Sequence, residues 1–179
     1  GAASESGSEV FEVDYFDRKA YLAQSPQFYK QMAMAAGFER YFECGPVFRA
    51  EKSYTSKHTT EFTGFDLEFS YIESFRDVMK MEEDLLTYAL GVVAEKYGEQ
   101  VKETFGLEVI VPEKPFPVVK LADLYDALEK EYGYIVDESE KGDLTTEAEQ
   151  LSYKWVKEHY DHEFLFITDY SAEKRAFYH

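Results

Sequence analysis

Two stretches of the sequence carry charged residues whose types and spacing could do chemistry. Arg49 and Glu51 lie two residues apart in a segment with strand character, so their side chains point to the same face. Asp66 and Glu68 share one face of a second such segment. A guanidinium fork binds carboxylate or phosphate oxygens, and paired carboxylates bind an ammonium group or a metal ion. Joined as a hairpin, the two segments could hold a zwitterion on one face, although each alone is also typical of a solvated, salt-bridged sheet edge.

A short helix expected over residues 26–36 adds a further cation. Gln27, Lys30 and Gln31 are spaced i, i+3 and i+4, so they share one helix face. Lys30 lies near the beginning of the helix, where the helix dipole also favours anions. The sequence therefore predicts an anion-binding corner, with an ordinary exposed lysine as the alternative. In the polar loop between the two charged strands, His58 could reach phosphate groups.

The elements that position these residues follow from hydrophobic periodicity and turn residues. Strands are expected over 10–15, 19–22, 41–44, 47–51, 62–71 and 164–168, helices over 26–36, 74–98, 121–132 and 145–160, and irregular structure over 99–119. Gly45-Pro46 is expected to break one apolar run into two strands. Because strands and helices interleave without regular βαβ alternation, we expect an α+β fold with a mostly antiparallel sheet flanked by helices.

Composition narrows the class of protein. The chain has 179 residues, a formal net charge of −17 and 17% aromatic residues, which excludes a disordered acidic tail. The negative charge argues against a stand-alone nucleic-acid binder. No apolar run is long enough for a membrane span, and no secretory signal is visible at the beginning. The single Cys44 excludes a disulfide scaffold and a cysteine zinc site, fits a reducing cytosol, and is expected to be a packed thiol.

Several ordered segments resemble one family. Phe48-Arg49-Ala50-Glu51, Thr55, His58, Glu61-Phe62 and Asp66-Leu67-Glu68 together resemble motif 2 of the class II aminoacyl-tRNA synthetases, over residues 47–71. The stretch Gln24–Gln31 is similar to the aspartyl-tRNA synthetases of the archaeal and eukaryal type. The resemblance runs over nearly the whole chain. It implies the class II catalytic core, ATP-dependent activation of aspartate to aspartyl-adenylate, and transfer of the aspartyl group to tRNA.

The resemblance also implies roles for individual residues on the ATP side of the site. Arg49 is the expected catalytic residue, since the family's motif 2 arginine binds the α-phosphate of ATP and the reacting carboxylate. Glu51 matches the glutamate near the adenine, and His58 matches the histidine at the γ-phosphate. ATP and Mg²⁺ are the implied cofactors, with the magnesium ligands expected outside this chain and no metal site within it.

On the amino-acid side, the resemblance implies that Gln27 and Asp66 hold the ammonium group of aspartate. Lys30 would pair with the side-chain carboxylate, with Arg49 at the reacting carboxylate. Glu5 would belong to a mobile loop that closes over the amino acid.

The resemblance further implies a single partial catalytic domain over residues 1–179. Motif 1 would precede this segment and motif 3 would follow it, so we expect the chain alone to be inactive. In the full-length enzyme we expect tRNA as a partner, a homodimer, no membrane contact and a cytoplasmic location.

Three alternatives stay open. Pro26 and Lys30 together favour aspartate over asparagine, because the asparaginyl relatives lack that lysine and an amide needs no cationic partner. An asparaginyl-tRNA synthetase, or an asparagine synthetase-like paralogue that passes activated aspartate to ammonia, would share most of the pattern. A non-catalytic aspartate-binding or regulatory module would keep the pocket without the chemistry. Discrimination between the aspartate and asparagine tRNAs is not readable from this segment.

Overall fold

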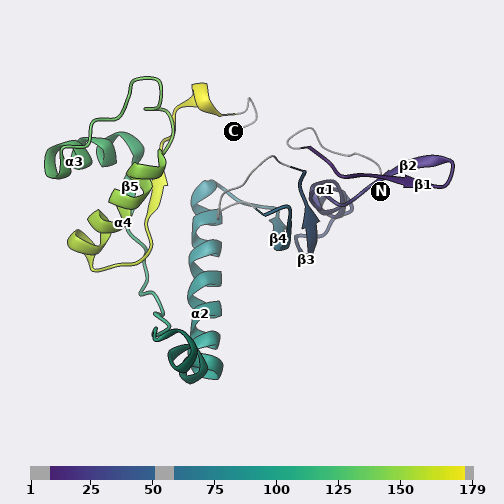
Figure 1. The fold of residues 1–179 in the computed structure, drawn as a ribbon, viewed down its shortest axis with the longest axis horizontal. Coiled ribbons are helices and arrows are strands. Elements are labelled where there is room, and N and C mark those ends of the chain that lie inside the picture. The colour runs from purple at the N-terminus through teal and green to yellow at the C-terminus, as the bar shows by residue number, and fades with distance from the viewer. Residues whose placement is uncertain (1–8, 51–58, 176–179) are drawn as a thin grey trace. The chain divides into compact units, whose positions relative to one another are not determined.

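The computed structural model describes residues 9–50 and 59–175, which divide between two units, Gly1–Glu73 and Ser74–His179. Within the described ranges there are four α-helices, one 3₁₀ turn and three two-stranded sheets (Figure 1). The expected α+β class is confirmed. Two of the strand pairs are antiparallel, as expected, but the third is parallel. Over the same ranges, no helix has the length and apolar character needed to cross a membrane.

The first unit is built on two hairpins and one helix. A short hairpin joins β1 (Glu12–Tyr15) to β2 (Arg18–Tyr21), and a longer one joins β3 (Arg40–Phe48) to β4 (Glu61–Phe69). Helix α1 (Gln27–Ala35) contacts both strands of the longer hairpin. Along β3, exposed and less exposed residues alternate, so that the odd-numbered side chains are the more covered ones. These face α1, and we call this side of the hairpin the α1 face.

Strand β3 runs without interruption through Gly45-Pro46, so the expected break there is wrong. The reason lies in the direction of the backbone N–H groups, which alternates along a strand. The N–H of Arg49 donates toward β4, to the carbonyl of Thr60 at 3.0 Å, whereas that of Phe48 donates the other way, to the carbonyl of Ala23 at 2.7 Å. Pro46 shares the outward direction of Phe48, so its missing N–H removes no bond to β4.

The same alternation corrects the expectation for the cysteine. Cys44 is even-numbered, so its side chain lies on the opposite side of the hairpin from α1. It is an exposed free thiol rather than a packed one. On that side the rings of Phe42 and Phe65 stack at 5.4 Å between centroids.

The second unit begins with the long helix α2 (Phe75–Phe105). Ser74 caps it by accepting from the backbone N–H of Arg76 at 3.2 Å, while the backbone N–H of Ser74 donates to Asp77 at 3.0 Å. The helix passes through Gly98, where we expected it to end, and stops at Gly106 in a left-handed conformation, φ 68°. A helix interior tolerates one glycine at a cost of about 1 kcal/mol, whereas a left-handed residue ends it.

The rest of this unit packs two helices against a parallel strand pair. Helix α3 (Leu121–Tyr132) has the expected bounds, and α4 (Thr146–Tyr160) begins one residue later than expected because Thr145 is its cap. The parallel strands are β5 (Val118–Lys120) and β6 (Phe166–Thr168), and a 3₁₀ turn covers Ala172–Lys174. The expected irregular stretch 99–119 therefore shrinks from both ends, because α2 takes its beginning and β5 takes its last residues.

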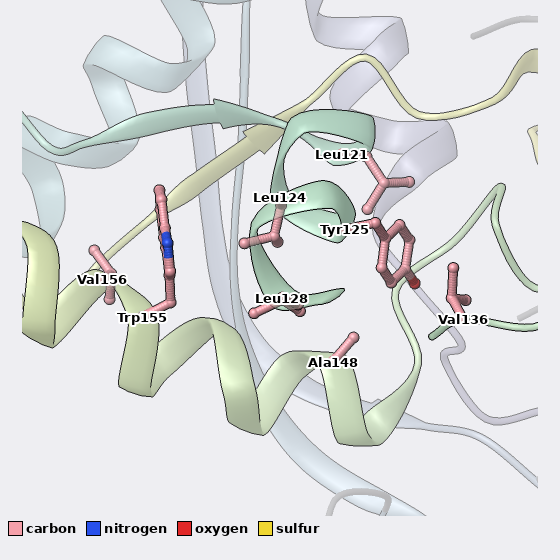
Figure 2. Close-up of a cluster of buried hydrophobic side chains, with 8 residues drawn as sticks. All are labelled: Leu121, Leu124, Tyr125, Leu128, Val136, Ala148, Trp155 and Val156. Carbon is pink, nitrogen blue, oxygen red and sulfur yellow. The ribbon is translucent and has the colours of Figure 1, made fainter. Parts of the chain in front are cut away.

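The core of the second unit lies between α3 and α4. Leu121, Leu124, Tyr125 and Leu128 follow the i, i+3, i+4, i+7 spacing of one helix face, and all are buried. Figure 2 shows them with the buried hydrophobic residues of α4, Ala148, Trp155 and Val156, and with Val136. The leucines at 124 and 128 are fully excluded from solvent. The α3–α4 pair is thus the best-packed part of this unit.

Candidate binding site on the long hairpin

A buried lysine marks one end of the α1 face. Lys30, on α1, is only 8% exposed, so the alternative of an ordinary surface lysine is wrong. Its Nζ pairs with the carboxylate of Asp66, and it lies 3.3 Å from Oε2 of Glu68. Both acidic residues are on β4, two residues apart and therefore on one face. The structure brings together a cation and two carboxylates separated by 36 and 38 positions in the chain.

The ion pairs decide the protonation state of Lys30. Burial by itself lowers the pKa of this ammonium group. The hydrogen bonds and negative charges of Asp66 and Glu68 act in the opposite direction and raise the pKa above its usual value. Lys30 is therefore a fixed positive charge at neutral pH, and Asp66 and Glu68 hold its ammonium in place.

A pocket of about 140 Å³ opens on the α1 face beside this cluster. Its floor is the directly opposed pair Gly45 and Gly64, whose lack of side chains leaves the hollow. A Cβ at Gly45 would meet nothing within 4 Å, so the space in front of it is open. Glu43 and Asp66 line one end of the pocket and Val47 lines the other, while Tyr29 covers it from α1.

Arg49 follows Val47 on the same face, just beyond the end of β3. Its guanidinium lies over the ring of Phe62, with 5.3 Å from Cζ to the ring centroid. The Nε atom is buried and has no hydrogen-bond partner among the described residues. A buried guanidinium N–H without an acceptor fits an anion such as a carboxylate or phosphate.

These positions make the site elongated. Glu43 pairs with Asp66 in the strand register, and Arg49 is six residues further along the chain, just beyond the end of β3. At the rise of a strand this separates the two ends by about 20 Å of backbone, with the glycine floor between them. An extended ligand with a positive group at the acidic end and a negative group at the arginine end would match the charges.

The remaining predicted residues divide into two groups. Gln27 begins α1 three residues before Lys30, is half-buried, and its backbone N–H donates to Oγ of Ser25 at 3.0 Å. Glu5, Glu51 and His58 lie outside the described residues. The described part of the chain contains no group of three or more histidine, cysteine or acidic side chains suited to hold a metal ion.

Sequence reasoning missed two features of this site. It did not single out Glu43, and it treated Gly45 as part of a turn rather than as a pocket floor. Both depend on the pairing of β3 with β4, which places Glu43 opposite Asp66 and Gly45 opposite Gly64. The sequence did contain one signal for them. Glu43, Gly45 and Arg49 are all odd-numbered, and alternate residues of a strand lie on the same face.

The comparisons with known proteins place the chain in a family. The model of the class II tRNA synthetases of the D, K and N group matches residues 1–179, so the chain belongs to this family. It is 45% identical over 178 residues to an aspartate–tRNA(Asp/Asn) ligase of Aeropyrum pernix, which covers 99% of this chain and 40% of that relative. The chain thus spans well under half the length of this relative.

Solved structures agree with the family assignment. An aspartyl-tRNA synthetase from Entamoeba histolytica matches 88% of this chain, and 32% of its own, with a TM-score of 0.76 at 32% identity. An asparaginyl-tRNA synthetase from Pyrococcus horikoshii, in complex with asparaginyl-adenylate, matches 98% of this chain and 39% of its own, also with a TM-score of 0.76, at 30% identity. The fold therefore does not separate aspartate from asparagine, and that choice rests on the site.

Proposed function

We propose that this chain is part of the catalytic domain of an aspartate–tRNA ligase, and that the long hairpin binds the amino acid and one side of ATP. The observation that carries the proposal is the buried, permanently charged Lys30 beside a pocket whose floor is two glycines. A ligand carboxylate gains from such a cation, whereas an amide does not. The 45% identity to an enzyme named as an aspartate–tRNA(Asp/Asn) ligase supports the same choice.

The lysine has one donor to give to a ligand. An ammonium group has three N–H donors, and the contacts with Asp66 and Glu68 use two of them. The third would bind the side-chain carboxylate of aspartate. Asp66, which also lines the pocket, would bind the α-ammonium group together with Gln27.

Arg49 would serve the reaction itself. In aspartate activation, a carboxylate oxygen of the amino acid attacks the α-phosphorus of ATP and pyrophosphate leaves. Such chemistry depends on positioning and charge stabilisation, so no protein nucleophile is needed. The unpartnered Nε of Arg49 would donate to the α-phosphate or to the reacting carboxylate. The ligands of Mg²⁺ are expected outside this chain. Glu51 and His58 are proposed to bind ATP, and Glu5 is proposed to bind the amino acid.

The remaining parts of the proposal concern the whole protein. We propose that both units belong to one catalytic domain, and that tRNA and a second subunit are partners of the longer enzyme. A cytoplasmic location is supported by the exposed free thiol of Cys44, which fits a reducing compartment. The relative's name includes both aspartate and asparagine tRNAs, and we propose no choice between them.

Calorimetry with the chain tests the amino-acid assignment. Aspartate should bind more tightly than asparagine, and Lys30→Ala should weaken aspartate far more than ATP. Lys19→Ala is the matched control, since Lys19 forms ion pairs on the exposed short hairpin. Equal losses for aspartate and ATP in Lys30→Ala would contradict the assignment. Aspartate binding without any ATP binding would favour the non-catalytic module.

A chimera tests catalysis. The matching segment of the Aeropyrum pernix relative is replaced by residues 1–179, and aspartate-dependent ATP–pyrophosphate exchange is measured. Retained exchange, lost again on Arg49→Ala, is the expected result. Exchange driven by asparagine instead would favour the asparaginyl alternative. We predict that the isolated chain is inactive. Robust ATP–pyrophosphate exchange by the isolated chain would overturn this prediction.

A further inference from the structure

Glu43 is an acidic residue of the pocket that the proposed roles leave unused. It lies on β3 directly opposite Asp66 and lines the same end of the pocket. Directly opposed residues of an antiparallel pair have Cβ atoms about 5 Å apart, and two like charges in that position destabilise the sheet. The hairpin keeps this unfavourable pair at the pocket, where a cation between the two carboxylates would relieve it.

The resident lysine does not supply that cation. Among the described residues, the α1 face carries three carboxyl side chains at this end, Glu43, Asp66 and Glu68, against one ammonium group, that of Lys30. Lys30 contacts the two residues of β4, while Glu43 lies across the ladder on β3. Negative charge therefore remains in excess, and the two residues that line the pocket, Glu43 and Asp66, present it to a ligand.

A tyrosine fixes the Glu43 carboxylate. The phenol of Tyr41, two residues earlier on the same face, donates a hydrogen bond to Oε1 of Glu43. This bond to the carboxylate raises the pKa of Tyr41, with burial adding to the effect, so the phenol stays protonated and keeps donating. One oxygen of Glu43 is thus held. The other makes no hydrogen bond or ion pair with a described residue and is available to a ligand.

We propose that Glu43 is a further specificity-determining residue, which binds the α-ammonium group of the amino acid together with Asp66, and that Tyr41 is its positioning residue. The inference rests on the proposed function, since it assigns the ammonium end of the same pocket. Recognition by two carboxylates would select a ligand that carries a cation at this end over a dicarboxylate that lacks one.

Succinate provides the test, because it is aspartate without the α-ammonium group. Dissociation constants for aspartate and succinate are measured by calorimetry on the chain, on Glu43→Gln and on Tyr41→Phe. The control is Glu39→Gln, the same change at an exposed position just before β3. Glu43→Gln removes a like-charge contact, so its thermal unfolding temperature should be unchanged or higher, which separates a binding defect from misfolding.

The expected result is a loss of about tenfold or more in aspartate affinity for Glu43→Gln, with succinate affinity unchanged or improved. A smaller loss, again for aspartate only, is expected for Tyr41→Phe, and no change for Glu39→Gln. An unchanged aspartate affinity in Glu43→Gln, or equal losses for both ligands, would overturn the role of Glu43 alone. If the unaltered chain bound no aspartate, both this inference and the proposed function would fall.

Discussion

Gly45 and Gly64 lie directly opposite each other across β3 and β4, and the pocket on the α1 face exists because neither has a side chain. The two positions are not equivalent. A Cβ at Gly64 would come within 3.4 Å of Cγ2 of Val47, whereas one at Gly45 would meet nothing within 4 Å. Gly45 is therefore the position at which the pocket can be filled without disturbing the hairpin.

Filling the pocket should block binding without unfolding the protein. In Gly45→Val, the new side chain occupies open space, and a β-branched residue suits a strand. We expect aspartate affinity to fall at least tenfold while the thermal unfolding temperature stays the same or rises. The control is Cys44→Val. Cys44 is adjacent to Gly45 in the chain but lies on the opposite side of the hairpin, so this substitution should leave aspartate affinity unchanged. Normal binding by Gly45→Val would place the ligand elsewhere.

Removing the charge of Lys30 should destabilise the first unit. Lys30→Met leaves Asp66 and Glu68, each about one-third exposed, without their cation. Breaking a fully buried pair costs about 3–5 kcal/mol, and partial exposure reduces this to about 1–3 kcal/mol at pH 7. The free energy of unfolding is measured by urea titration, with the exposed Lys19→Met as control. A loss no larger than that of Lys19→Met would contradict a stabilising role for the ion pairs of Lys30.

Two glycines of α2 should respond to alanine in opposite directions. Gly98 lies inside the helix with open space around its Cα, so Gly98→Ala should stabilise by about 1 kcal/mol. Gly106 ends the helix at φ 68°, where a side chain is strained, so Gly106→Ala should destabilise by about 1–2 kcal/mol. Both values come from urea unfolding. Stabilisation by both substitutions would show that the helix does not end at Gly106.

The second unit carries a tyrosine whose contribution to stability should disappear at alkaline pH. Burial, followed by the hydrogen bond to Glu158 at 2.5 Å, raises the pKa of Tyr132 to about 12. In the unfolded chain a tyrosine titrates near 10. The stabilisation is thus complete below pH about 10 and is lost as the pH rises to about 12.

The matching measurement compares the chain with Tyr132→Phe. The difference in free energy of unfolding between the unaltered chain and Tyr132→Phe should be constant from pH 7 to about 9. It should decrease as the pH rises further. A second variant, Tyr88→Phe, removes an exposed phenol on α2 and serves as a control for general alkaline effects. An unchanging difference up to pH 12 would contradict the proposed cause.

The sequence predicted the helices whose bounds depend on neighbouring residues, such as apolar spacing and capping residues. Helix α3 has its expected bounds because its apolar spacing and the glycine that follows it agree. The cap at Ser74 was readable, whereas the far end of α2 was not, since Gly98 and Gly106 look alike until the backbone angle is known. The run through Gly45-Pro46 was missed for a related reason: a proline is tolerated in a strand according to which way its nitrogen faces.

The site was predictable in its parts and not in its assembly. Residue types and spacing identified Lys30, Arg49 and Asp66 as candidates, and parity placed Asp66 and Glu68 on one face. The contact between Lys30 and Asp66 joins a helix to a strand 36 positions away, so it depends on tertiary packing. The opposed pair Glu43 and Asp66 depends on strand register, which no local pattern in either strand specifies.

The outward-facing nitrogen of Pro46 has a consequence for how the protein behaves at high concentration. An open strand edge is a template for pairing with another chain, and a row of N–H donors is what makes it so. On β3 this row is interrupted at Pro46, and the donor of Phe48 is already taken by Ala23. A strand from another chain could not form a continuous hydrogen-bond ladder along this part of the edge. The part of β3 that lines the pocket is therefore also protected against aggregation by strand pairing.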